Sequence, residues 1–237
     1  VIMVMIFAIA PIWVYPIFLM KVMCFALFAG AFNLLLGFGG LLSFGHAMFM
    51  GSAGYVAAYS AKAWGLNPEW CVLLGTAAST VLALVVGLLA IRRQGIYFAM
   101  ITLALAQMVF FFCLQAPFTG GEDGIQAVPR GKLFGLINLE DNFNMYLFVL
   151  SIFLLGFLLI WRVVHSPFGQ ILKAIREHPD RATSLGYDTD TFKLLAFVIS
   201  GALAGTSGAT KALVFQLASL TDVHWSMSGE VVLMTLV

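Results

Sequence analysis

Long stretches without a charged side chain are the feature that most restricts the fold of this chain. No Asp, Glu, Lys or Arg occurs in residues 1–20, 22–61, 70–91, 94–121, 142–161 and 194–210. About 20 helical residues cross the roughly 30 Å hydrocarbon core of a bilayer, so most of these runs are long enough for one crossing. The chain is therefore predicted to be an all-α polytopic membrane protein, a bundle of about seven or eight transmembrane helices.

The composition supports a bilayer rather than water as the solvent. Of 237 residues, 62% are hydrophobic and 10% are charged, whereas soluble domains carry about 25% charged residues. The net charge of +1 includes no basic block that could neutralise a phosphate backbone, which argues against a nucleic-acid partner. The three cysteines have neither disulfide nor zinc spacing, so no metal site is expected from them.

The boundaries of the spans can be estimated from prolines and glycines. Residues 1–20 are predicted to form a helix bent at Pro11 and Pro16. The run 22–61 is long enough for two crossings, with a break at the glycines of Gly37-Phe38-Gly39-Gly40. The chain starts at Val1 rather than Met and stops seven residues after Glu230, so we expect residues 1–237 to be a single transmembrane domain of a longer protein, lacking at least one C-terminal helix.

Basic residues predict which segments face the cytoplasm. Arg92 and Arg93 lie between two spans, and five further basic residues lie within 162–193. Cytoplasmic loops carry an excess of Lys and Arg, and the two spans between these regions allow both to face the same side. This orientation places residues 116–143 outside.

The segment 162–192 is predicted to form a cytoplasmic loop with two short helices. Pro167 fits a first helical position, and Phe168, Ile171, Leu172 and Ile175 repeat at the spacing of one apolar stripe. Pro179 ends this helix and Gly186 can end a second one. Such amphipathic helices can be held by a peripheral protein or can lie on lipid, and the periodicity does not separate the two.

Several motifs, in order along the chain, resemble those of one transporter family. They are Asn33-Leu34, Gly37, Gly39-Gly40, Ser43, Gly45-His46 and Gly51; Gly95-Ile96-Tyr97-Phe98-Ala99-Met100; Thr119-Gly120-Gly121; Ala174-Ile-Arg-Glu-His-Pro-Asp-Arg-Ala; and Leu185-Gly186-Tyr187. From about residue 30 onward the chain resembles the permease subunits of branched-chain amino acid ABC importers. In that family the loop matching residues 174–186 docks into a cytoplasmic ATPase.

This resemblance implies an inward transporter of branched-chain or related neutral amino acids in the bacterial inner membrane. Its implied partners are two cytoplasmic ATP-binding subunits, a homologous permease subunit, and a periplasmic or lipid-anchored binding protein. The residues implied to contact the ATPase are Ala174, Arg176, Glu177, Ala182 and Gly186. No lysine is followed by Ser or Thr, so the chain has no P-loop, and ATP is expected to bind the partner subunits. Nothing in the sequence indicates an enzyme or a metal-binding protein, since the four histidines are scattered.

Three sites are candidates for contact with the transported solute or its carrier. Irregular backbone at membrane depth must be buried or line a cavity, so Gly39, Gly40, Ser43 and His46 mark either a substrate pathway or a packed helix break. Lys211, inside a span, either lines the pathway or extends its amine to the outer interface. On the outside, Thr119, Gly120 and Gly121 form either a docking loop for the binding protein or a flexible connection.

Two other kinds of transporter fit parts of the sequence. A urea- or amide-type ABC importer shares the same framework, and these residues do not distinguish it. A secondary transporter or channel working without ATP would place carboxylates within the spans, and the acidic residues lie instead in predicted loops.

Overall fold

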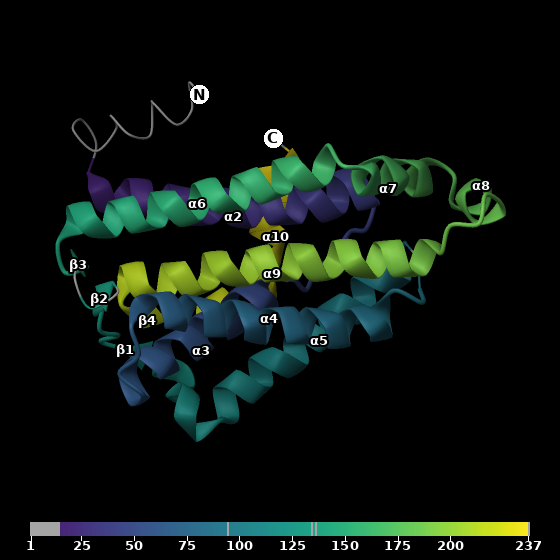
Figure 1. The fold of residues 1–237 in the computed structure, drawn as a ribbon. Helices are drawn as coiled ribbons and strands as arrows, with labels where there is room; N and C mark the ends of the chain where they lie inside the picture. The colour runs from purple at the N-terminus through teal and green to yellow at the C-terminus, as the bar shows by residue number, and fades with distance from the viewer. Residues whose placement is uncertain (1–14, 94, 134, 136, 237) are drawn as a thin grey trace.

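The computed structural model describes residues 15–93, 95–133, 135 and 137–236, and it is a bundle of long helices (Figure 1). The main helices are α2 (Pro16–Asn33), α3 (His46–Ala63), α4 (Pro68–Ala90), α5 (Ile96–Gln115), α6 (Asn142–Val164), α7 (Pro167–Glu177), α8 (Pro179–Ser184), α9 (Thr189–Phe215) and α10 (Trp225–Leu236). Four short strands pair in two small antiparallel ladders, β1 (Ile125–Gln126) with β4 (Leu217–Ala218) and β2 (Lys132–Leu133) with β3 (Ile137–Asn138). The prediction of an all-α polytopic membrane protein is confirmed.

Five helices among the described residues are long and apolar enough to cross a membrane. They cover Pro16–Phe38, Pro68–Ala90, Ile96–Gln115, Asn142–Val164 and Thr189–Phe215. The first of these corrects a predicted boundary, because α2 starts at Pro16 and continues through Lys21. Most of the helix predicted at 1–20 lies outside the described residues.

The predicted break in the run 22–61 is present and takes a specific form. The last turns of α2 widen into a π-helix, η2 (Leu34–Phe38), and Gly40 then has a φ of +67°, a left-handed conformation that favours glycine. The second half of this run, α3, has most of its side chains buried among neighbouring helices. Because α3 faces protein rather than lipid, it can carry polar residues such as Ser52 and Ser60.

The centre of the bundle is α9, which packs against α2, α3 and α4. Small residues make this packing possible: a Cβ added at Gly208 would lie 1.9 Å from the carbonyl oxygen of Met50, and one at Gly205 would lie 2.3 Å from the Cβ of Ser79. Close backbone approach of this kind replaces the missing hydrophobic drive between helices in lipid. Gly208 therefore lies directly against α3, whereas Gly205 lies against α4.

The connections gather at the two ends of the bundle. In Figure 1, α7 and α8 lie at one end and the four short strands lie at the other. Two 3₁₀ turns, η3 (Pro117–Thr119) and η4 (Gly121–Asp123), precede β1, and a third, η5 (Leu220–Asp222), follows β4. This arrangement fits the prediction that segments 116–143 and 162–193 lie on opposite sides of the membrane.

Candidate functional site

The end of the bundle that carries α7 and α8 has a groove between these two helices. This α7–α8 groove has a volume of about 360 Å³ and is lined by Gln170, Ile171, Ala174, Glu177, His178, Arg181, Ala182, Leu185 and Tyr187. It forms because α7 is amphipathic: Leu172 and Ile175 are buried against the bundle, whereas Ala174 and Glu177 are exposed. The structure thus brings together Ala174, Glu177 and Ala182, three of the residues predicted to contact an ATPase.

The other two predicted contact residues lie differently. Gly186 has a φ of +91° directly after α8, and the N–H of Tyr187 returns to the carbonyl of Ala182. Arg176 is on the opposite side of α7, and its Nη1 donates a hydrogen bond to the carbonyl oxygen of Gly37 in the π-helix. Lys173, three residues earlier, lies 5.2 Å from the centroid of the Phe38 ring. Two basic residues of α7 therefore bind the helix break rather than line the groove.

Gly39 and Gly40 lie at this contact. They line a cavity of about 670 Å³ together with Arg176 and Lys193. A Cβ at Gly40 would lie 2.9 Å from the Cγ of Arg176. These glycines consequently allow α7 to approach the turn between α2 and α3. Their assignment to a substrate pathway stays a prediction.

Ser43 and His46, the polar residues that follow the glycines, are completely buried. The Oγ of Ser43 accepts a hydrogen bond from the N–H of Gly45, and the Nε2 of His46 is 2.8 Å from the Oγ of Ser200 on α9. Three aromatic rings surround the imidazole, those of Phe32, Phe49 and Phe197. His46 therefore holds the start of α3 against α9, whereas Ser43 bonds within the turn that precedes α3.

At the opposite end, Thr119 is buried and anchors the loop after α5. Its Oγ1 donates to the carbonyl oxygen of Ala116 at 2.6 Å. Gly120 and Gly121 both have positive φ, and a Cβ at Gly120 would lie 2.3 Å from the carbonyl oxygen of Gly124. The three predicted docking residues therefore form a tightly packed turn, and their docking role stays a prediction.

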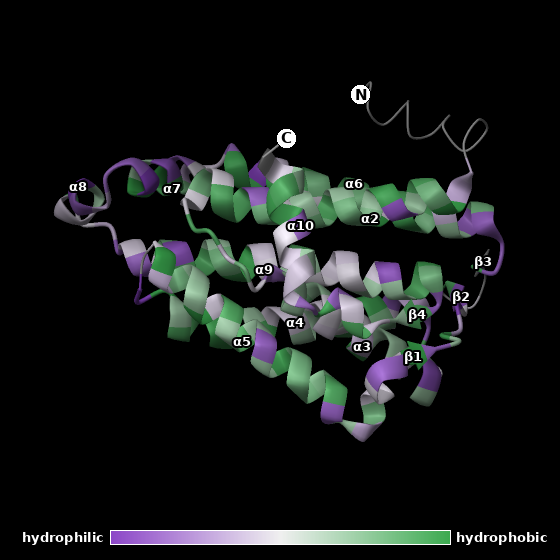
Figure 2. Ribbon diagram, turned by 180° about the vertical axis from the view of Figure 1, so that it is seen from behind, coloured by the Kyte–Doolittle hydropathy of each residue, from purple (hydrophilic) through white to green (hydrophobic). Residues whose placement is uncertain are grey.

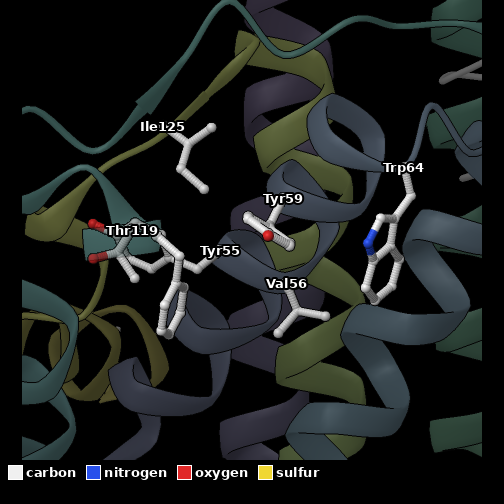
Figure 3. A pocket seen from close by; sticks show the side chains of 7 residues that line it. Tyr55, Val56, Tyr59, Trp64, Thr119 and Ile125 are labelled. Carbon is white, nitrogen blue, oxygen red and sulfur yellow. The ribbon is translucent and has the colours of Figure 1, made fainter. Parts of the chain in front are cut away.

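Thr119 also borders an aromatic cavity of about 370 Å³ (Figure 3). Its other lining residues are Tyr55, Val56, Tyr59, Trp64, Phe118 and Ile125. The Tyr59 ring centroid lies 6.0 Å from that of Trp64 and 6.1 Å from that of Phe118. Aromatic side chains are typical of the membrane–water interface, which fits the location of this cavity near the end of the bundle.

Lys211 lies near the end of α9 that joins β4. Its Nζ forms an ion pair of 2.5 Å with the Oδ1 of Asp222, and each side chain is 14% exposed. The same Nζ is 4.9 Å from the centroid of the Phe25 ring. The sequence did not identify Asp222 as the partner of Lys211, because the two residues belong to different elements. Their short separation of eleven positions is the one signal that could have suggested the pair.

The described part of the chain contains no cluster of three or more His, Cys, Asp or Glu side chains that could hold a metal ion. The described helices form a membrane bundle with a tight glycine-rich core and an amphipathic helix, α7, at one end. A family model described as the permease component of a branched-chain amino acid transport system matches residues 15–237, and the chain belongs to this family.

Curated relatives agree with this family. The LivM permease protein of the high-affinity branched-chain amino acid transport system of Salmonella typhimurium is 30% identical over 199 residues, covering 74% of this chain and 47% of the relative. The LivM protein of Escherichia coli is 29% identical over 199 residues, which again cover 74% of this chain and 47% of the relative. A probable LivH permease protein of Methanocaldococcus jannaschii is 33% identical over 76 residues, 32% of this chain and 23% of the relative.

The chain thus spans about half the length of the LivM proteins that it matches. No solved structure matches it.

Proposed function

We propose that this chain is the membrane-spanning permease subunit of an ABC importer that moves branched-chain amino acids into the cell. ATP would be hydrolysed on two separate cytoplasmic subunits, and the chain itself would catalyse no reaction. A homologous permease subunit and a periplasmic or lipid-anchored binding protein would complete the assembly in the bacterial inner membrane. The family match over residues 15–237 supports the class of solute.

The α7–α8 groove is the observation that carries the ATP-driven part of this proposal. It is exposed, lies at one end of the bundle, and presents apolar and charged side chains together, notably Ile171, Leu185, Glu177 and Arg181. An interface that must bind and release a partner combines a small apolar centre with charged residues around it. Arg176 and Lys173 link the same helix to η2, so a displacement of α7 would reach the start of α3.

Charge reversal in the groove tests this role. Glu177→Arg is expected to reduce co-purification of the ATP-binding subunits and to lower leucine uptake at least about tenfold, because a like charge placed in an interface costs several kcal/mol. Glu140→Arg is a matched control, since Glu140 is exposed at the other end of the bundle. Full uptake and full co-purification by the Glu177→Arg complex would contradict the docking role.

A further inference from the structure

A second groove runs along the side of the bundle, between α2, α9 and α10. This α2–α9–α10 groove has a volume of about 700 Å³. It is lined by Phe18, Lys21, Val22, Phe25, Lys211, Phe215, Leu217, Ser219, Thr221, Asp222, Met227, Glu230 and Met234. Figure 1 shows α10 behind the space between α2 and α9, in agreement with this lining.

The groove contains charges of both signs. Lys211 and Asp222 form the partly buried ion pair, whereas Lys21 on α2 and Glu230 on α10 are exposed. Among the described residues, neither Lys21 nor Glu230 has a hydrogen-bonding or ion-pair partner. The four formal charges cancel, so the groove suits a ligand that carries both a carboxylate and an ammonium group better than a simple anion or cation.

The remaining walls are mostly apolar. Phe25 and Phe215 lie beside Lys211, and Met227 and Met234 face the groove from α10. Methionine side chains adapt to ligands of different shape, so a wall of this kind can accept several aliphatic groups. Urea carries neither a formal charge nor an apolar group, so it would use neither property of the groove.

The bilayer gives an independent reason to regard this face as functional. Charged side chains within a membrane are costly, face the bundle interior or a water-filled cavity, and mark solute pathways. Lys21 lies within the helix Pro16–Phe38, which is apolar enough to span a membrane, and it is exposed on the outside of the described bundle. This face is therefore better suited to water, solute and a neighbouring subunit than to lipid.

We propose that the α2–α9–α10 groove binds the transported solute as a zwitterionic α-amino acid with an aliphatic side chain. Lys211 and Lys21 would bind the carboxylate, Asp222 and Glu230 the ammonium group, and Phe25, Phe215 and Met227 the side chain. The existing Lys211–Asp222 pair would open to admit the ligand between its two charges. This assignment rests on the proposed function.

Cysteine modification of the full-length chain in its complete transporter complex tests the site directly. Met227→Cys would be treated with a small, negatively charged methanethiosulfonate, with and without excess leucine. Cys24, Cys71 and Cys113 are buried, so the background should be low. Modification should be fast, and leucine should slow it several-fold. Urea, 4-methylpentanoate and isoamylamine should not slow it, because 4-methylpentanoate lacks the ammonium group, isoamylamine lacks the carboxylate, and urea lacks both. Met108→Cys, on the apolar surface of α5, is the control and should be unreactive.

Uptake by charge variants gives a second readout. Lys21→Gln and Glu230→Gln alter exposed side chains, so both should assemble normally and yet lower leucine uptake about tenfold, as expected when a charged partner of a ligand is lost. Lys62→Gln, on α3, should leave uptake unchanged. The site would be overturned, but not the proposed function, if the wild-type complex transports leucine and two results hold together. Leucine does not slow the modification of Met227→Cys, and both charge variants take up leucine normally. A wild-type complex that transports no leucine would overturn the proposed function itself.

Discussion

The two sides of this bundle differ in a way that separates lipid contact from protein and solute contact. Large apolar side chains are exposed on α4, α5 and α6, among them Leu84, Leu88, Met108, Leu155 and Leu158. In Figure 2 the ribbons of these helices are coloured mostly as hydrophobic. The only charged residues in these three helices are Glu69 and Arg162, near their ends. The α2–α9–α10 side instead carries Lys21, Lys211, Asp222 and Glu230 in one groove.

The difference shows how one chain can have one surface suited to lipid and another suited to water and a charged solute. A surface that faces hydrocarbon needs only apolar area, whereas a surface that handles a charged solute must keep charges at membrane depth and cover them with protein or water. Between the two sides, α9 packs closely on α3. The following predictions test each part of the comparison in order of decreasing effect.

The contact of α9 with α3 should be the least tolerant place in the chain. Gly208→Leu would drive a side chain into the backbone of Met50, and overpacking of this kind costs about 3 kcal/mol or more. We expect the variant protein to fail to accumulate in the membrane, as measured by size-exclusion chromatography after solubilisation. Gly229→Leu on α10 is the control, because a Cβ there has no neighbour within 4 Å in the described structure. Equal yields would contradict the assigned packing.

A new charge should distinguish the two sides. Leu84→Lys places an amine on the apolar surface of α4, where a lysine near the centre of a span costs roughly 3 kcal/mol. Val22→Lys adds the same group beside the α2–α9–α10 groove. Membrane yield and thermal stability should fall for Leu84→Lys and remain close to wild type for Val22→Lys. The reverse order would show that the lipid-facing side has been wrongly assigned.

Arg176 should matter for coupling rather than for folding. Its guanidinium is exposed and its bond to the Gly37 carbonyl joins α7 to η2. Arg176→Gln should keep the ATPase activity of the assembled complex and lower leucine uptake several-fold, because the movement of α7 would no longer reach the helix break. Lys132→Gln at the other end of the bundle should change neither activity. Parallel losses of ATPase and uptake in Arg176→Gln would point to a docking role instead.

The smallest effect is expected at the start of α9. The side chain of Asp188 accepts hydrogen bonds from the hydroxyl and the N–H of Thr191, and these bonds lower the pKa of the carboxyl below its usual value. A depressed pKa means that the capping contribution is present at neutral pH and is lost as the pH falls through the acidic range. Asp188→Ala, which removes the accepting oxygens, should speed hydrogen exchange in the first turn of α9 at neutral pH, unlike Asp190→Ala. Identical exchange in both variants would rule out the cap.

Local patterns in the sequence were sufficient to predict four of the five spanning helices of the described residues, and the helix break. Apolar runs identify spanning helices because each helix must satisfy the bilayer along its own length, and the glycines at 37–40 mark a turn that only glycine adopts easily. The start of α2 was wrong because Lys21 was taken to end a span, whereas the structure places it on the side of one helix. A charge count along the chain cannot register that a lysine can lie in a groove on the side of a spanning helix.

The α2–α9–α10 groove could not be predicted for a related reason. Its charges lie at positions 21, 211, 222 and 230, and only the folding of α2 beside α10 brings the first near the others. Lys211 was singled out because it is isolated in an apolar span, but Asp222 and Glu230 were read as loop residues. Ala174, Glu177 and Ala182 were easier to group, since two adjacent short helices bring them together.

ATP-dependent uptake of labelled leucine tests the central claim most directly. The full-length chain, its neighbouring permease, the ATP-binding subunits and the binding protein would be reconstituted in proteoliposomes, with and without ATP on the side of the ATP-binding subunits. The account predicts leucine uptake only with ATP, with competition by isoleucine and valine but not by urea. Uptake of urea instead would contradict the assigned solute, and leucine uptake that proceeds equally without ATP would contradict the proposed ABC mechanism.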